Sequence, residues 1–184
     1  MNPKIYLITG VMASGKSTVG QMLAERLERA VHLRGDAFRR MIVSGREDMR
    51  DNPPEEAIRQ LMLRYRLTAE AARGYWSAGF DVVVQDNYYG EMLPHMLGLL
   101  EGMPVRTVVL CPSAETVAAR EAARGKQGYG GYDVRPLYDS FMAETPRLGM
   151  WLDTTNLTPE ETVERILVED SLHGGLNSNS TLVY

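Results

Sequence analysis

Residues 10–18 read Gly10-Val11-Met12-Ala13-Ser14-Gly15-Lys16-Ser17-Thr18, which is the pattern G-x-x-x-x-G-K-S. The stretch before it, 4–9, has the composition of a buried strand, and apolar residues follow it at helical spacing. This strand–loop–helix context separates a phosphate-binding loop from a chance match in a glycine-rich turn. The stretch therefore predicts a nucleotide-phosphate site that begins almost at the first residue.

Each residue type in this loop has a chemical reason. Gly10 and Gly15 allow a tight turn and let backbone N–H groups approach a polyphosphate. Lys16 supplies a positive charge, Ser17 offers a hydroxyl to Mg²⁺, and the helix that opens here adds its positive dipole end. We expect the loop residues that bind the nucleotide to be Gly10, Ala13, Ser14, Gly15, Lys16, Ser17 and Thr18.

Length and composition predict one globular domain. The chain has 184 residues, of which 44% are hydrophobic and 24% charged. We expect the domain to span residues 1–170, with 171–184 as a polar C-terminal tail. Oligomeric state is not legible in the sequence, because an exposed apolar patch cannot be told from core by pattern alone.

Charge and cysteine content narrow the partners and the compartment. The 20 basic and 24 acidic residues argue against general binding to nucleic acid or to an anionic membrane. Cys111 is the single cysteine, so no intrachain disulfide can form. With neither an N-terminal leader nor a run long enough to span a membrane, the sequence predicts a cytoplasmic protein.

The second expected strand, 31–34, leads directly to Asp36. This carboxylate can cap the helix expected over 37–43. It would also lie at the carboxyl end of a parallel strand, where open α/β sheets bind ligands, and could accept the proton of an attacking hydroxyl. We regard Asp36 and its neighbour Arg39 as candidate substrate-binding residues.

A long helix is expected from about Pro54 to Ala78, with Gly79 ending it. Six arginines lie in or just before this segment, and most are interpreted as solvated. One or two of them could clamp a negatively charged acceptor. They are Arg46, Arg50, Arg59, Arg64, Arg66 and Arg73.

The strongest strand in the sequence is Phe80-Asp81-Val82-Val83-Val84-Gln85, whose β-branched run is typical of a central parallel strand. It delivers Asp86, Tyr88 and Tyr89 to the same rim as Asp36. Asp86 could hold Mg²⁺ directly or through water, orient a substrate hydroxyl, or simply begin a turn. The two tyrosines are expected to form walls of the substrate pocket.

A glycine-rich segment over about 125–135 is predicted to form a lid. A fourth strand, 104–110, and a helix capped by Ser113 precede it. This helix carries Arg120 and Arg124, which share a face and could meet the transferring phosphates when the lid closes, or could simply be exposed. A fifth strand is expected at 150–153, and Thr158-Pro159-Glu160-Glu161 predicts the start of the last helix.

Five strands that alternate with helices predict a parallel sheet covered on both faces. The stretches GVMASGKST, RGDAFRR, VVVQDNYY, REAARGK and LDTTNLTPEETVERI together resemble the small P-loop kinases. That group includes shikimate kinase, gluconate kinase and chloramphenicol phosphotransferase. The resemblance implies a three-layer α/β P-loop NTPase fold, with a five-stranded parallel sheet in the order 2-3-1-4-5 and a short lid.

The resemblance also implies roles for particular residues. ATP with Mg²⁺ would be the phosphate donor, Ser17 and Asp86 would be near the metal, and Asp36 would be the catalytic base. Arg120 would pack on the adenine and Arg124 would contact phosphates. The loop after the fifth strand would bring Thr155 and Asn156 close to the adenine.

The function expected from these features is an ATP-dependent kinase that phosphorylates a hydroxyl on a small molecule. An antibiotic, a sugar or another metabolite would serve, and only the resemblance favours an antibiotic. One alternative is a nucleoside, nucleotide or RNA-end kinase, although the acidic balance weighs against a polynucleotide acceptor. A second alternative is a nucleotide-binding switch whose loop controls a partner.

Overall fold

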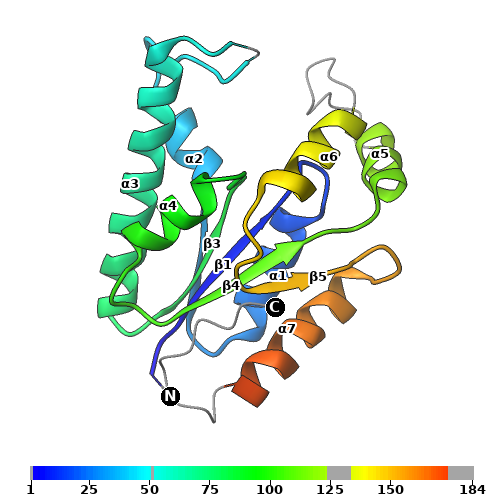
Figure 1. Cartoon of the computed structure of the whole chain (residues 1–184). Helices are drawn as coiled ribbons and strands as arrows, with labels where there is room; N and C mark the ends of the chain where they lie inside the picture. The colour runs from blue at the N-terminus through cyan, green and yellow to red at the C-terminus, as the bar shows by residue number, and fades with distance from the viewer. Residues whose placement is uncertain (1, 51, 124–133, 174–184) are drawn as a thin grey trace.

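The computed structural model describes residues 2–50, 52–123 and 134–173, in which every strand is followed by one or two helices (Figure 1). The strands are β1 (Ile5–Gly10), β2 (Ala30–Arg34), β3 (Asp81–Gln85), β4 (Val105–Leu110) and β5 (Met150–Leu152). The helices are α1 (Lys16–Arg26), α2 (Gly35–Arg40), α3 (Glu55–Ser77), α4 (Met92–Leu99), α5 (Ala114–Ala123), α6 (Val134–Glu144) and α7 (Pro159–His173).

The strands form one parallel sheet in the order β2-β3-β1-β4-β5, as predicted. β1 is central: Ile5 is in register with Val82 of β3 and with Val105 of β4. All six residues of β1 are buried. Because all five strands run the same way, their carboxyl ends meet at one edge, where α/β sheets bind ligands.

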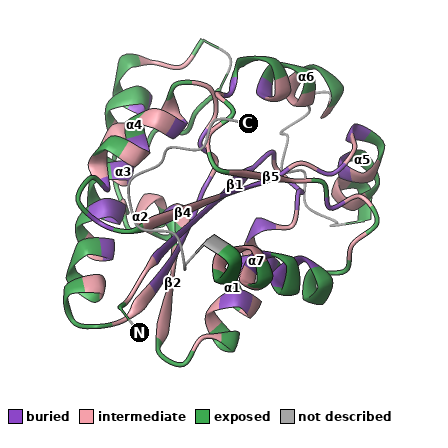
Figure 2. Cartoon of the chain, turned by 60° about the horizontal axis from the view of Figure 1, so that its bottom comes forward, coloured by how far each residue is buried: buried purple, intermediate pink, exposed green. Residues whose placement is uncertain are grey.

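Alternation along the strands sorts side chains between two cores. Val82 and Val84 of β3 face the core that contains residues of α3, α4 and α6, whereas Val83 faces the core that contains residues of α1 and α7. Figure 1 shows these two groups of helices on opposite faces of the sheet, and Figure 2 shows that helices of both groups carry buried as well as exposed residues. The three-layer α/β fold class is therefore confirmed.

One expected helix boundary was wrong. α2 begins at Gly35 with Arg34 as its N-cap residue, so Asp36 lies in the first helical turn and does not cap it. The local reason is that Asp36 bonds to side chains of its own helix, Arg39 and Arg40. The last helix, α7, runs to His173, and the division expected at residue 170 between domain and tail stays a prediction.

Two predicted helix starts are confirmed in atomic detail. The Thr158 N–H donates to Glu161 Oε2 at 2.8 Å, and the Glu161 N–H donates to Thr158 Oγ1 at 3.1 Å, which is a reciprocal capping box. The Ser113 hydroxyl oxygen accepts the N–H of Thr116 at 3.2 Å at the start of α5. These local hydrogen bonds fix helix ends that spacing alone had predicted.

The expected lid falls mostly outside the described residues. Residues 124–133 are not described, and Val134 and Arg135 already belong to α6. Residues 174–184 of the expected tail are also outside the described range. In the part of the chain that the structure describes, no helix is both long enough and apolar enough to cross a membrane.

Candidate active site

The loop between β1 and α1 has the backbone that its sequence predicts. Gly10 has a φ of 144°, and a Cβ there would lie 2.4 Å from the carbonyl oxygen of Leu110. Gly15 has a φ of 103° and is the N-cap residue of α1. Ala13 has a φ of 63°, an uncommon value for a residue with a side chain and one that concentrates at functional sites. The loop therefore needs glycine at both ends and holds Ala13 in a left-handed conformation.

Lys16 lies inside this loop. Its side-chain Nζ donates to the carbonyl oxygens of Gly10 and Val11, each at 2.7 Å, and the residue is only 6% exposed. Its charge is therefore held beside the backbone that would surround a phosphate. Ser14 is also buried, and Thr18, one turn into α1, is exposed.

The oxygen-bearing side chain that reaches Ser17 is Gln85. The Ser17 hydroxyl donates to Gln85 Oε1 at 3.2 Å. Gln85 follows Val83 by two residues on β3, so both point toward α1. A hydroxyl and an amide oxygen suit a hard cation such as Mg²⁺, so Ser17 fits the predicted metal-binding role. Within the described ranges no three His, Cys, Asp or Glu residues gather into a metal site.

Asp86 forms a buried ion pair with Arg64. Its Oδ1 accepts hydrogen bonds from Arg64 Nη2 of α3 at 2.5 Å and from the Asn87 N–H at 2.8 Å. Burial raises the pKa of Asp86 above its ordinary value, although the Arg64 guanidinium and the Asn87 N–H act in the opposite direction. Asp86 follows Gln85 and binds Arg64 on the α3 side of the sheet, and the charge of Lys16 also acts to lower its pKa. This pairing does not fit a direct metal ligand.

Arg64 departs from the solvated role expected of most arginines in its segment. Its side chain is 13% exposed, and its Nε has no hydrogen-bond partner among the described residues. Spacing along α3 could not reveal this pairing, because the partner is 22 residues away on another element.

Gly35 was not singled out in the sequence, and its role is steric. A Cβ on Gly35 would lie 1.9 Å from Asp86 Oδ2. That oxygen is buried and has no hydrogen-bond partner in the described part of the chain. The turn from β2 into α2 therefore packs its backbone directly against the Asp86 carboxylate.

Asp36 lies one residue further, in the first turn of α2. Its carboxylate binds Arg39 Nε at 2.8 Å and Arg40 Nη2 at 2.6 Å. Partial burial acts to raise the pKa of Asp36, but the two guanidinium groups outweigh it and hold the pKa below its usual value. Asp36 is therefore ionised at neutral pH. Arg39 also binds Asp48 from the following loop, so the predicted substrate-binding Arg39 already has two carboxylate partners.

The structure places Tyr88 in the core, whereas Tyr89 is only partly buried and its predicted role stays a prediction. Tyr88 is 0% exposed, and its ring centroid lies 5.0 Å from that of Tyr65 in the core. Its N–H donates to Thr9 Oγ1 at 2.9 Å, which fixes this segment to β1. Tyr88 is therefore a core residue, which corrects the prediction. Tyr89 is partly buried and packs edge-on against Phe141.

Arg120 reaches the phosphate loop from α5. Its Nη1 donates to the Ser14 carbonyl and its Nη2 to the Thr154 carbonyl, both at 3.1 Å. The neighbouring Thr155 hydroxyl oxygen accepts the Ser113 N–H at 2.8 Å. These contacts bring together the predicted nucleotide-binding residues Arg120, Ser14 and Thr155.

The other two predicted residues on this side are not joined to that group by any described contact. Asn156 is exposed in the turn after β5. Arg124 lies outside the described residues. Their predicted roles stay predictions.

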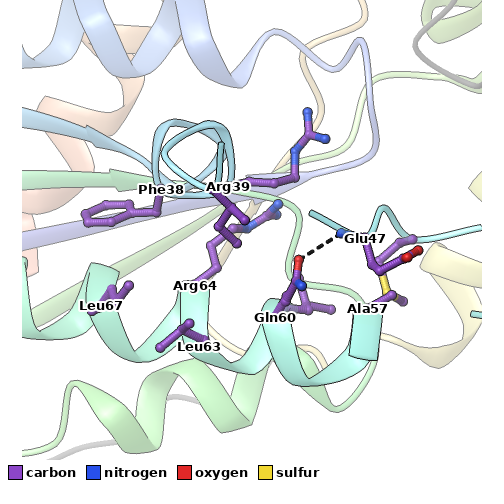
Figure 3. Close-up of a pocket in the computed structure, with 11 residues that line it drawn as sticks. Phe38, Arg39, Glu47, Ala57, Gln60, Leu63, Arg64 and Leu67 are labelled. Carbon is purple, nitrogen blue, oxygen red and sulfur yellow. Dashed lines mark hydrogen bonds between the residues drawn. The ribbon is translucent and has the colours of Figure 1, made fainter. Parts of the chain in front are cut away.

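A pocket of about 50 Å³ opens between α2, the loop that follows it and α3 (Figure 3). Arg39 and Arg64 both line it, so it adjoins the two carboxylates at the ends of β2 and β3. Most of its other lining residues are apolar. They are Phe38, Ile42, Met49, Ala57, Leu61, Leu63 and Leu67, with Glu47 and Gln60 as the polar members.

Comparison with protein families agrees with this geometry. Residues 5–135 match the model of a family described as AAA domain, which covers more than half of the chain and includes the phosphate loop and the pocket. The chain belongs to this AAA domain family. A search of curated proteins found no sequence match.

Solved structures with the same fold include several kinases. A sugar kinase from Janibacter sp. HTCC2649 has a TM-score of 0.64 at 19% identity, over 96% of this chain and 99% of the other. The tunicamycin resistance protein of Deinococcus radiodurans has a TM-score of 0.65 at 18% identity, with coverages of 91% and 95%. The APS kinase CysC of Mycobacterium tuberculosis, in complex with AMPPNP and APS, has a TM-score of 0.68 at 16% identity, with coverages of 91% and 96%. The predicted resemblance to small P-loop kinases is confirmed at the level of fold.

Proposed function

We propose that this protein is an ATP-dependent kinase that transfers the γ-phosphate to a hydroxyl of a small molecule. The observation that carries the proposal is an arrangement at one edge of the sheet. Lys16 and its loop lie at the end of β1, while the ionised Asp36 lies beyond β2, beside a pocket. A phosphate site and a proton acceptor on either side of β3 suit transfer from a nucleotide to a separate acceptor.

In this reaction the acceptor oxygen attacks the γ-phosphorus and forms a new O–P bond. The bond between the γ-phosphorus and the bridging oxygen breaks, and ADP leaves with the electron pair. Asp36 takes the acceptor proton, and a partly exposed carboxylate that is ionised at neutral pH can do so. Bound Mg²⁺ would neutralise charge on the phosphates, with Ser17 as its protein ligand.

The remaining predicted residues divide between the two substrates. Lys16 and the loop N–H groups would hold the β- and γ-phosphates, and Arg120, Thr155 and Asn156 would lie on the nucleotide side. Arg124 would approach the phosphates. The α2–α3 pocket would receive the acceptor, which Asp36 and Arg39 would border. Support comes from the contacts of Arg120 with Ser14 and Thr154, which place one predicted nucleotide residue against the loop.

The proposal is tested by an ADP-release screen over hydroxyl compounds that include antibiotics, sugars and nucleosides. Asp36→Asn should lower acceptor-dependent ADP release by about 10²–10⁴-fold, the usual contribution of a general base, and leave ATP affinity near normal. Glu164→Gln, an exposed carboxylate on α7, is the matched control. Near-normal transfer by Asp36→Asn would remove its assigned role. Slow hydrolysis with no acceptor phosphorylated would favour a nucleotide switch.

A further inference from the structure

We propose that the acceptor is an uncharged hydroxyl compound that inserts an apolar group into the pocket between α2 and α3. This inference rests on the proposed kinase function and specifies the acceptor's chemical class. It sets aside acceptors that would bring a phosphate, sulfate or carboxylate into this pocket. Two properties of the lining carry it: its apolar surface and the pairing of its cations.

The apolar surface comes from both sides of the pocket. Phe38 and Ile42 lie on the α2 side, and Leu61, Leu63 and Leu67 lie along α3. Figure 3 shows Phe38, Leu63 and Leu67 along one stretch of the pocket. Leu63 and Leu67 are 38% and 37% exposed, so an apolar group in the pocket would remove them from water.

The two arginines of the pocket already face carboxylates of the protein. Arg39 binds Asp36 and Asp48, and Arg64 binds Asp86. Glu47, the third charged lining residue, is acidic. An anionic group on an acceptor would therefore meet no lining cation that lacks a carboxylate partner.

An anionic acceptor could gain a strong contact only by displacing one of these partners. An anion that displaced Asp86 from Arg64 would leave the Asp86 carboxylate buried without its guanidinium partner, which is strongly unfavourable. An anion that took the place of Asp36 on Arg39 would remove the contact that orients Asp36, the proposed base. The charge arrangement thus disfavours an anion at both positions.

The wall of the pocket is already held in place. Gln60 Nε2 of α3 donates to the Gly45 carbonyl at 2.8 Å. Figure 3 shows the second bond, in which Gln60 Oε1 accepts the Glu47 N–H at 2.9 Å. One side chain thus pairs with the loop backbone at two positions. A preformed apolar wall lowers the ordering cost of binding a neutral ligand.

The test compares two probes of similar shape, 4-methylbenzyl alcohol and 4-(hydroxymethyl)benzoate. Each is titrated into the full chain with saturating ADP and Mg²⁺, and the methyl signals of labelled methionines are followed by NMR. We expect the neutral alcohol to bind at least tenfold more tightly and to shift the methyl signal of Met49, which lines the pocket. The assignment of that signal comes from Met49→Leu.

A pair of matched variants tests the location. Leu63→Gln should weaken the neutral probe by about fivefold, because part of a leucine's burial is lost. Leu172→Gln, the same change at an exposed position of α7, should leave the affinity unchanged. Both variants keep a good helix-forming residue.

The outcomes separate the two proposals. Equal affinities for the two probes, absence of binding by either, or an unaltered affinity in Leu63→Gln would each overturn the acceptor class. Binding of fluorescent ADP is measured on the same samples. If the protein binds ADP but phosphorylates none of the hydroxyl compounds, the result would instead count against the kinase function itself.

Discussion

The lysine of the phosphate loop and two side chains of α3 that line the pocket are held in different ways. The Lys16 ammonium binds nearby backbone, the carbonyls of Gly10 and Val11, six and five residues before it. The acceptor wall consists of α2, α3 and residues 41–50 and 52–54 between them, and two of its side chains bind partners on other segments. Arg64 and Asp86 are 22 residues apart, and Gln60 and Gly45 are 15 apart. Local contacts can be read from spacing, whereas the wall depends on how whole elements pack.

The largest expected effect comes from removing the cation that joins the wall to β3. Arg64→Met should lower the free energy of unfolding by about 3–5 kcal/mol at neutral pH, because Asp86 would be buried without its partner. Urea unfolding measures this. Arg66→Met, at an exposed neighbour, should change stability by less than about 0.5 kcal/mol.

The pH dependence of Arg64→Met follows from the same carboxylate. Without Arg64 the folded-state pKa of Asp86 should rise further above its unfolded value, so the folded state binds its proton more readily. The stability of the variant should therefore fall as the pH rises through that folded pKa, and the deficit should be smaller at pH 5 than at pH 8. A deficit that does not vary with pH would contradict the buried pair.

The next effect breaks the local side of the comparison. Lys16→Met should lower ATP-dependent phosphoryl transfer by about 10²–10³-fold, the usual loss when a group that stabilises transferring charge is removed. Fluorescent ATP binding and urea unfolding on the same samples separate lost affinity from lost folding. Unchanged transfer would mean that the loop is not the phosphate site.

A smaller effect tests the contact between the start of α2 and the residue that follows β3. Gly35→Ala should destabilise the protein by about 1–3 kcal/mol, because the new Cβ would overlap Asp86 Oδ2. Gly74→Ala in α3 is the matched control, since a Cβ there meets nothing within 4 Å. The control should be stabilising by about 0.5–1 kcal/mol. Similar values for the two variants would show that Gly35 has room.

The smallest effect is the pH dependence of stability that His32, packed against α1, produces. His32 of β2 lies against Gly20 of α1, and burial, followed by the charge of Arg34, lowers its pKa to about 4. Between pH 6.5 and 4 the unfolded chain binds the proton more readily, so acidification across this window should cost on the order of 1–2 kcal/mol of stability. His32→Gln should flatten the dependence by that amount. Equal slopes for both proteins between pH 7 and 4 would contradict this prediction.

Much of the fold was predictable because its signals are local. The phosphate loop, the buried run of β3 and the capping box at Thr158 each lie within a few residues, and the resemblance supplied the strand order. A helix does follow β2, but the bounds expected for it, 37–43, and its Asp36 cap were wrong. The helix begins at Gly35, and the Asp36 carboxylate in its first turn pairs with Arg39 and Arg40.

The site was predictable only in part. Alternation along β3 does contain a signal that was not used: Val83 and Gln85 share one face, and Val84 and Asp86 share the other. It would have directed Gln85 toward Ser17 and Asp86 toward α3. Arg64 and Gly35 carry no such signal, because their importance arises from the packing of α2 and α3 against the end of β3.

The two hydrogen bonds of the Lys16 ammonium have a consequence for nucleotide affinity. A phosphate that binds Lys16 enters an exchange reaction, in which new contacts replace the bonds to Gly10 and Val11. The measured contribution of Lys16 to binding is then a difference between two partnered states, smaller than the strength of its phosphate contact. In the same exchange the carbonyl oxygens of Gly10 and Val11 lose the Lys16 ammonium as their hydrogen-bond donor. The measured enthalpy and entropy of nucleotide binding therefore include this change in the loop's own backbone.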